Sequence, residues 1–145
     1  MFTGLALSSA PSAAASTAAE TETITQSASA GPARGFWAVS HSTKAKISGT
    51  YQYWYAGRAG GRALYDGRFM GATAEDRVAG DKYQAVLALK YDEFVGGAWR
   101  PVKNRVAVVN GTKSWSFKNK ANVVAYACDR KVGTKKLLNC DSWSF

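Results

Sequence analysis

The sequence predicts an all-β fold, an antiparallel β-sandwich of about seven or eight short strands with one disulfide in its C-terminal hairpin. Three observations support this prediction. Apolar and polar residues alternate with a period of two over much of the chain, glycine-containing turns separate these stretches, and no stretch combines a helical period with helix caps. The 145 residues suit one domain, and a hydrophobic content of 46% is enough to form its core.

The first strands are predicted in the region that follows Phe36. Residues Lys44–Tyr55 alternate, with Ile47 and three tyrosines on one face and lysines and small polar residues on the other. The glycine-rich residues 56–63 break this pattern and predict a turn. A second strand is expected over residues 63–70, followed by a polar connection.

The next stretches predict the centre of the sheet. Residues 82–91 carry apolar side chains on both faces, which indicates a central strand with burial on both sides. The chain is expected to turn back through Gly96 and Gly97 into a strand at residues 102–109. That strand ends at Asn110-Gly111, a dipeptide suited to a turn with positive φ.

The last strands are predicted at residues 113–118, where Trp115 and Phe117 alternate with polar residues, and in a closing hairpin formed by residues 121–128 and 137–145. These stretches complete the expected sandwich, to which we assign residues 36–145. The terminal hairpin has a partner on one side only, so its ends would fray without a further constraint.

The only two cysteines of the chain lie across this closing hairpin. Eleven residues separate Cys128 from Cys140, and two cysteines allow a single bridge, which we expect to be structural. Closing a loop of that length stabilises the fold by about 3 kcal/mol in the chain-entropy estimate. The alternative is a pair of unpaired buried thiols. No further Cys or His lies nearby, so no metal site is expected here.

The N-terminal residues predict export. Residues 1–15 contain a short apolar run that ends in small residues with an Ala-x-Ala pattern, and we interpret them as a truncated signal peptide without its basic region. The run is too short to span a bilayer. We therefore expect a secreted, extracellular protein, in a compartment where disulfides persist. The alternative is a merely Ala- and Ser-rich chain end.

Residues 16–35 form a separate segment of low apolar content, which we expect to be a flexible N-terminal extension. Its centre is locally β-prone and is the candidate partner-binding segment, because such a segment can become a strand against a partner. The candidate residues are Glu22, Thr23, Ile24, Thr25 and Gln26. The alternative is a plain spacer.

No motif predicts catalysis, and we expect no catalytic residue, no metal and no cofactor. His41 is the only histidine, and no Gly-x-Ser-x-Gly element accompanies it. The acidic residues show no spacing that selects a pair for glycoside chemistry. Glu75, Asp76 and Asp81 share one loop, which makes calcium conceivable, but the EF-hand pattern is absent. The sequence therefore favours a binding protein over an enzyme.

The formal net charge of +9 favours contact with acidic surfaces. Trp54, Trp99 and Trp115 alternate with basic residues, as in proteins that bind nucleic acid or carbohydrate by stacking. A secreted protein seldom meets nucleic acid as its ligand, so we expect no nucleic-acid partner. A carbohydrate-binding face remains an alternative, as does a solvated basic surface without a ligand.

From Tyr65 onward the chain resembles small secreted β-sandwich proteins of Streptomyces and other actinobacteria. The resemblance is carried by YDGRFMGATAEDRVAGDKYQAVLALKY, NGTKSWSF and VVAYACDRK followed by LLNCDSW. It extends to the adaptor subunits of umbrella toxin particles, which join a trypsin-like lectin subunit to the Ala-Leu-Phe repeats of a large toxin. It implies that residues 22–26 enter the lectin subunit and that the basic face meets the repeats.

The predicted function is that of a secreted, non-enzymatic protein-binding module, an adaptor in an interbacterial toxin complex. Its expected partners are other secreted proteins, namely a lectin-like subunit and a large repeat toxin. The alternative function is a free-standing extracellular binder of cell-wall polymer or carbohydrate, which the basic and aromatic composition also fits.

Overall fold

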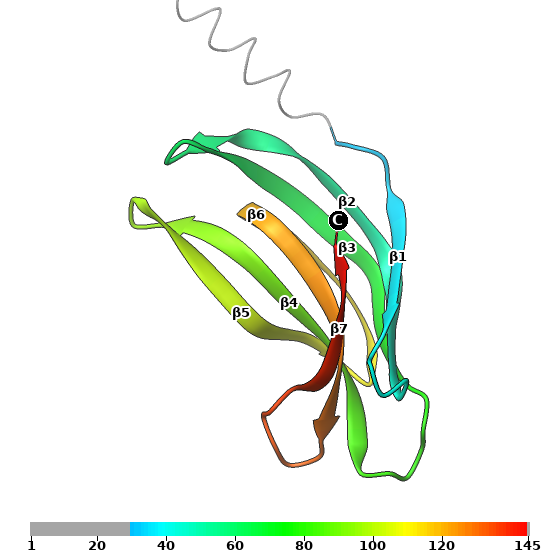
Figure 1. Ribbon diagram of the computed structural model, residues 1–145. Helices are drawn as coiled ribbons and strands as arrows, with labels where there is room; N and C mark the ends of the chain where they lie inside the picture. The colour runs from blue at the N-terminus through cyan, green and yellow to red at the C-terminus, as the bar shows by residue number, and fades with distance from the viewer. Residues whose placement is uncertain (1–29, 145) are drawn as a thin grey trace, which may run out of the picture.

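The computed structural model describes residues 30–144, in which seven strands form one antiparallel sheet folded into two layers (Figure 1). It confirms the all-β class, the antiparallel pairing and the Cys128–Cys140 disulfide. The strands are β1 (Arg34–Val39), β2 (Ala45–Ala59), β3 (Arg62–Asp76), β4 (Tyr83–Val95), β5 (Ala98–Val109), β6 (Gly111–Lys131) and β7 (Leu138–Ser144). Residues 1–15 and the candidate segment Glu22–Gln26 lie outside the described residues.

Strand β6 connects the two layers. Its first half pairs with β3, and its second half pairs with β4 on one edge and β7 on the other. The strand bends back between these halves, where Asn119 and Asn122 have φ of 54° and 52°, a region that asparagine tolerates better than most residues. We expected two strands at this position, and the structure has one bent strand of 21 residues.

One layer therefore consists of β1, β2, β3 and the first half of β6, and the other of β7, the second half of β6, β4 and β5 (Figure 1). This arrangement gives the sandwich two different sides. On one side β1 lies near β7, where the His41 N–H donates to the Asn139 carbonyl at 2.8 Å. On the other side the first half of β6 faces β5 across a cavity.

The hairpins are longer than the sequence pattern indicated. The turns lie at Gly60-Gly61 and Gly96-Gly97, where all four glycines have positive φ. Asn110 has the expected positive φ, 39°, but leads the chain into the other layer instead of closing a hairpin. Two hydrogen bonds with Ala85 hold this corner, one from the Asn110 N–H at 3.0 Å and one to its side-chain oxygen at 2.8 Å.

Apolar side chains fill the space between the layers. Phe36, Ile47 and Phe69 come from one layer and Leu87 and Leu89 from the other, and all are buried. Alternating positions on β4 pack on the outer face as well, in a second cluster made of Val86, Ala88 and Cys128 with Leu137 and Cys140 around it. The expectation that this strand is buried on both faces is confirmed, because the disulfide and its neighbours cover its outer face.

The described chain enters the sheet slightly before the predicted boundary at residue 36. The Gly31 N–H donates to the Tyr53 carbonyl at 3.0 Å, and the Gln52 side-chain amide donates to the Gly31 carbonyl at 2.6 Å. Pairing in β1 then starts at Arg34. Residues 30–144 contain no helix with the length and apolar character needed to cross a membrane.

Candidate functional site

A buried carboxylate ties the two layers together on the β1/β7 side, here called the closed side. Asp129 is 1% exposed, and its oxygens accept hydrogen bonds from Ser40 Oγ at 2.9 Å, from Ser42 Oγ, and from Asn139 Nδ2 at 2.8 Å. Ser40 also accepts a bond from the Ala45 N–H at 3.1 Å. A buried charge is costly unless hydrogen bonds satisfy it, and here three donors do so.

The hydrogen bonds of Ser40 and Ser42 also bear on whether His41 could act as a catalytic base. Its Nδ1 lies 3.9 Å from an Asp141 oxygen, and its side chain is 67% exposed. The neighbouring hydroxyls of Ser40 and Ser42 bond to Asp129 and not to the imidazole. An activated nucleophile needs a hydrogen bond to its base. The described residues place no such pair around His41.

The acidic loop considered for calcium is organised by an ion pair. Asp81 Oδ2 lies 3.1 Å from the Lys44 ammonium, which also sits 4.6 Å from the centre of the Tyr83 ring. The Tyr83 N–H bond and the Lys44 contact lower the pKa of the Asp81 carboxyl, and the Asp81 contact raises the pKa of Lys44. Within residues 30–144 no group of three or more His, Cys, Asp or Glu side chains is placed to hold a metal ion.

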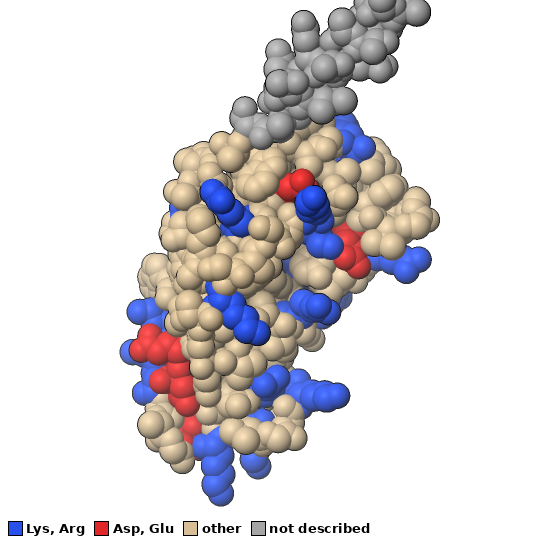
Figure 2. Space-filling model, turned by 180° about the vertical axis from the view of Figure 1, so that it is seen from behind, with Lys and Arg blue, Asp and Glu red and all other residues tan. Residues whose placement is uncertain are grey.

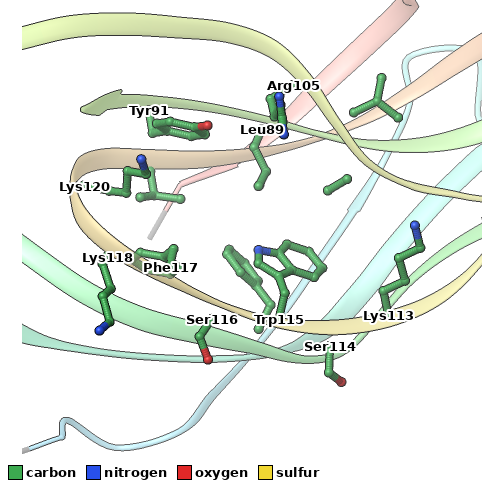
Figure 3. A pocket seen from close by; sticks show the side chains of 14 residues that line it. Leu89, Tyr91, Arg105, Lys113, Ser114, Trp115, Ser116, Phe117, Lys118 and Lys120 are labelled. Atoms are coloured by element: carbon green, nitrogen blue, oxygen red, sulfur yellow. The ribbon is translucent and has the colours of Figure 1, made fainter. Parts of the chain in front are cut away.

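The opposite side of the sandwich is open. A cavity of about 680 Å³, here called the groove, lies between the first half of β6 and strand β5 (Figure 3). Six consecutive residues of β6, Lys113–Lys118, line it, together with Arg105–Ala107 of β5. Successive side chains of a strand point to opposite faces. A cavity lined by consecutive residues therefore runs along the edges of these strands.

Aromatic rings form the floor of the groove. The Trp115 ring stacks on the Phe69 ring, with centroids 4.7 Å apart and an angle of 25° between the planes. The centroid of the Phe117 ring lies 5.8 Å from that of Phe69. At one end the Lys120 ammonium lies 4.8 Å from the Tyr91 ring (Figure 3). Trp115 and Phe117 are only half-buried, so part of each ring remains available to a ligand.

Cations form the rim of the groove. Lys120 is neutralised by Glu93 at 2.6 Å, whereas Arg105, Lys113 and Lys118 are exposed and form no ion pair with any described residue. Among the residues that the structure describes, no Asp or Glu lines this cavity. Figure 2, a view of the molecule from behind, shows Lys and Arg side chains scattered over that face and Asp and Glu in a few small groups. The groove therefore presents an apolar floor beside unneutralised positive charge.

A second cavity of about 390 Å³ shares the Phe69 and Phe117 walls of the groove. Tyr51, Tyr53 and Tyr65 line it, with Tyr51 and Tyr53 stacked at 6.1 Å and Tyr65 edge-on to Tyr53 at 5.7 Å. Tyr51 and Tyr53 were predicted to share one face of their strand, and the structure places both in this cavity beside Tyr65 of β3. The described chain begins beside them, through the bond from Gly31 to the Tyr53 carbonyl.

A further contact between the layers, here called the clasp, joins the tips of the β2–β3 and β4–β5 hairpins. These tips lie side by side in Figure 1. Arg62 donates to Asp92 at 2.7 Å and lies 4.3 Å from the centre of the Trp99 ring. Trp99 Nε1 donates to the Ala59 carbonyl at 2.9 Å. The Arg62 hydrogen bond, helped by one from Asn122, lowers the pKa of the Asp92 carboxyl. The clasp fixes the distance between the layers at this end.

The structure separates the tryptophans that the sequence grouped. Trp115 lies in the groove, Trp99 belongs to the clasp, and Trp54 lies on β2 away from both. Sequence reasoning missed the Asp129 network, because two of its three donors, Ser40 and Ser42, lie 89 and 87 positions away in the sequence. Comparison with known protein families, curated proteins and solved structures found no match to this chain.

Proposed function

We propose that this chain is a secreted, non-enzymatic module that binds other proteins. The groove supports this proposal most directly. Its aromatic floor and free cations lie on a body that Asp129, the clasp and the disulfide hold rigid. A rigid apolar surface with unneutralised charge at its rim is typical of a recognition surface, where little ordering entropy is lost on binding.

The proposed role within a complex is that of an adaptor with two binding regions. The first is the extension at residues 16–35, with Glu22–Gln26 as the segment that enters a trypsin-like lectin subunit. The second is the body, which meets the Ala-Leu-Phe repeats of a large toxin. The resemblance to umbrella toxin adaptors supports these partners. The export signal proposed at residues 1–15 and the disulfide favour secretion.

A deletion tests the two-region proposal. The variant lacks Ser16–Ser29 and keeps Ala30 and Gly31, because Gly31 bonds to Tyr53 and Gln52. We expect an unchanged near-ultraviolet circular dichroism spectrum and thermal midpoint. In pull-downs from the secreted proteins of the producing organism, the variant should lose the lectin-like partner and retain the toxin. Capture of neither partner by the full chain would overturn the proposal.

A second candidate function is favoured by the same groove. Trp115 beside Arg105, Lys113 and Lys118 also fits an anionic cell-wall polymer, since sugar rings stack on indole and cations track phosphates or carboxylates. Sedimentation with purified wall polymer tests this function. A wall-polymer binder would keep its ligand after deletion of Ser16–Ser29 and release it at high salt, whereas the adaptor proposal predicts no sedimentation above that of a control protein.

A further inference from the structure

We propose that the groove binds an extended acidic segment of a partner protein, which adds as a strand to the unpaired edge of β6 between Lys113 and Lys118. This inference rests on the proposed protein-binding function and specifies the chemistry of the partner. The segment carries apolar side chains on the face toward the sandwich interior and carboxylates along its length. Three observations lead to it: the pairing of β6, the floor of the groove and the charges at its rim.

The first half of β6 has a free edge. Strand β3 occupies one edge of this half, and the pairing of β4 with the opposite edge begins only at Lys120. No other strand within residues 30–144 pairs with β6 between Lys113 and Lys118. An unpaired edge presents a row of N–H and C=O groups that an incoming strand can satisfy. Because the groove follows this edge, access to it is open.

The facing strand is a poorer template. Within residues 30–144 strand β5 pairs only with β4, but it contains Pro101, which lacks an N–H, and Asn104, which has a φ of 55°. Proline and local irregularity both disfavour the addition of a strand to an edge. Residues Lys113–Lys118 contain no proline and no positive φ. The incoming segment is therefore assigned to β6, with β5 as the opposite wall.

The floor sets the apolar positions of the segment. Trp115 and Phe117 point from β6 toward the space between the layers, while Ser114, Ser116 and Lys118 alternate with them and are exposed. A paired strand places every second side chain on the same face as Trp115 and Phe117. Apolar side chains at those positions cover the half-buried rings and remove them from water.

The rim sets the charge of the segment. Lys118 lies on the outer face of β6, Lys113 at the other end of the same stretch, and Arg105 across the groove on β5 (Figure 3). None of these cations has an ion-pair partner in the described part of the chain, and no carboxylate lines the groove. Opposite charges across a strand pair are favourable and like charges are not. Acidic side chains are therefore preferred at the positions of the incoming strand that alternate with its apolar ones.

Anionic polysaccharides and nucleic acids complement the positive charge of the groove, but they cannot pair with the unpaired edge of β6. Neither polymer carries an alternating row of N–H and C=O groups with the spacing of a strand ladder, so neither satisfies the backbone between Lys113 and Lys118. Backbone pairing thus distinguishes a polypeptide from the other anionic ligands. The experiment is designed to measure that pairing separately from the attraction between charges.

The probe is a synthetic peptide of about ten alternating Glu and Val residues, the length of a typical strand. Binding to the full chain is measured by titration calorimetry, and backbone pairing by hydrogen exchange of the Lys113–Lys118 amides. We expect saturable binding that weakens with salt, and slower exchange over this stretch. The double variant Lys113→Glu/Lys118→Glu should bind at least about tenfold more weakly, which corresponds to about 1.4 kcal/mol.

Two controls isolate the contributions of site and backbone. Lys135→Glu/Lys136→Glu makes the same change of charge in the exposed loop before β7 and should leave binding unchanged. A peptide with alternate backbone nitrogens methylated keeps its side chains but cannot pair along the blocked edge, so it should lose most of its affinity. Equal binding of the methylated peptide, or equal loss in the loop variant, would overturn the inference.

Three further outcomes distinguish this inference from the proposed function. Polyglucuronate that binds as tightly as the peptide and slows the same amides would assign the groove to an anionic polymer. Full capture of the toxin partner by the Lys113→Glu/Lys118→Glu variant would refute the groove as the binding site and leave the protein-binding function standing. If the wild-type chain captures no secreted protein at all, the proposed function itself fails.

Discussion

The two sides of this sandwich differ in whether their charged groups have partners within the described chain. On the closed side a single carboxylate, Asp129, is almost fully buried and accepts hydrogen bonds from three side chains. On the open side Arg105, Lys113 and Lys118 surround an aromatic floor without an acidic neighbour in the groove. Satisfied buried polar groups hold layers together, whereas unpaired charges beside exposed rings are suited to an external partner. The closed side therefore stabilises the body, and the open side is left for binding.

The largest expected effect comes from breaking the closed side. Asp129→Ala removes the acceptor for Ser40, Ser42 and Asn139 and deprives the buried Ser40 hydroxyl of its bond to the carboxylate. We expect a loss of about 3 to 5 kcal/mol in the free energy of unfolding, measured in urea. Asp141→Ala serves as the control, because its side chain is 50% exposed, and should cost less than about 0.5 kcal/mol. Similar losses in both variants would contradict the structural role of Asp129.

The disulfide is the next largest contribution on the closed side. Replacing both Cys128 and Cys140 by Ala should cost about 3 kcal/mol, because the denatured chain regains the freedom of the closed loop. The loss should be concentrated near the C-terminal hairpin. Hydrogen exchange should therefore accelerate more for the amides of β7 than for those of β2. Hydrogen exchange of the double variant measures this gradient. Equal acceleration in both strands would show that the bridge does not act locally.

A smaller effect is expected when the floor of the open side is disturbed. A Cβ at Gly67 would lie 2.4 Å from the Phe117 ring and 2.6 Å from the Gln52 carbonyl oxygen. Gly67→Ala should therefore displace Phe117 and cost about 1 to 3 kcal/mol of unfolding free energy. Gly35→Ala is the matched control, since its nearest contact is 3.8 Å away. An unchanged aromatic circular dichroism signal in Gly67→Ala would show that the floor is not packed as described.

The difference between the sides also explains what the sequence could predict. Alternation identified strands such as β2, which bury a single face, and the cysteine spacing identified the hairpin bridge. The bend of β6 was missed because the pattern stops at residues 119–120 and so indicated two strands, whereas the two asparagines bend a single strand there. Asp129 continues the inward face of Ala125 and Ala127, so a carboxylate at an apolar position was the available signal. Two of its partners, Ser40 and Ser42, are distant in sequence, and local patterns do not reveal them.

The groove was less predictable for the same reason. Trp115 and its alternation with polar residues were visible in the sequence, but aromatic residues at period two are equally typical of a core. The groove exists because β6 bends and leaves one edge of its first half unpaired, opposite Arg105 of a different strand. Such an edge depends on the order of strands in the sheet, and that order is set by packing between distant segments.

The pH dependence of stability tests whether the clasp between the hairpin tips holds the two layers together at the open side. Arg62 lowers the pKa of Asp92 below its ordinary value of 3.8, so the carboxylate contributes stability above that pH and loses it as the pH falls through the lower folded value. Asp92→Asn should therefore destabilise the protein at neutral pH, and the difference from wild type should shrink below about pH 4. Urea unfolding across this range measures it. Arg62→Gln should flatten the same part of the profile, and an unaltered profile would refute the coupling.

The smallest expected effect on stability tests the comparison most directly. Lys113 and Lys118 are exposed and form no ion pair within the described chain, so Lys113→Glu/Lys118→Glu should change the free energy of unfolding by less than about 0.5 kcal/mol. Urea unfolding measures this change beside that of Asp129→Ala. A loss above about 1 kcal/mol would mean that the lysines support the body. Stability that is unchanged while peptide binding falls would show that the rim of the groove serves binding alone, because the closed side and the clasp already hold the layers.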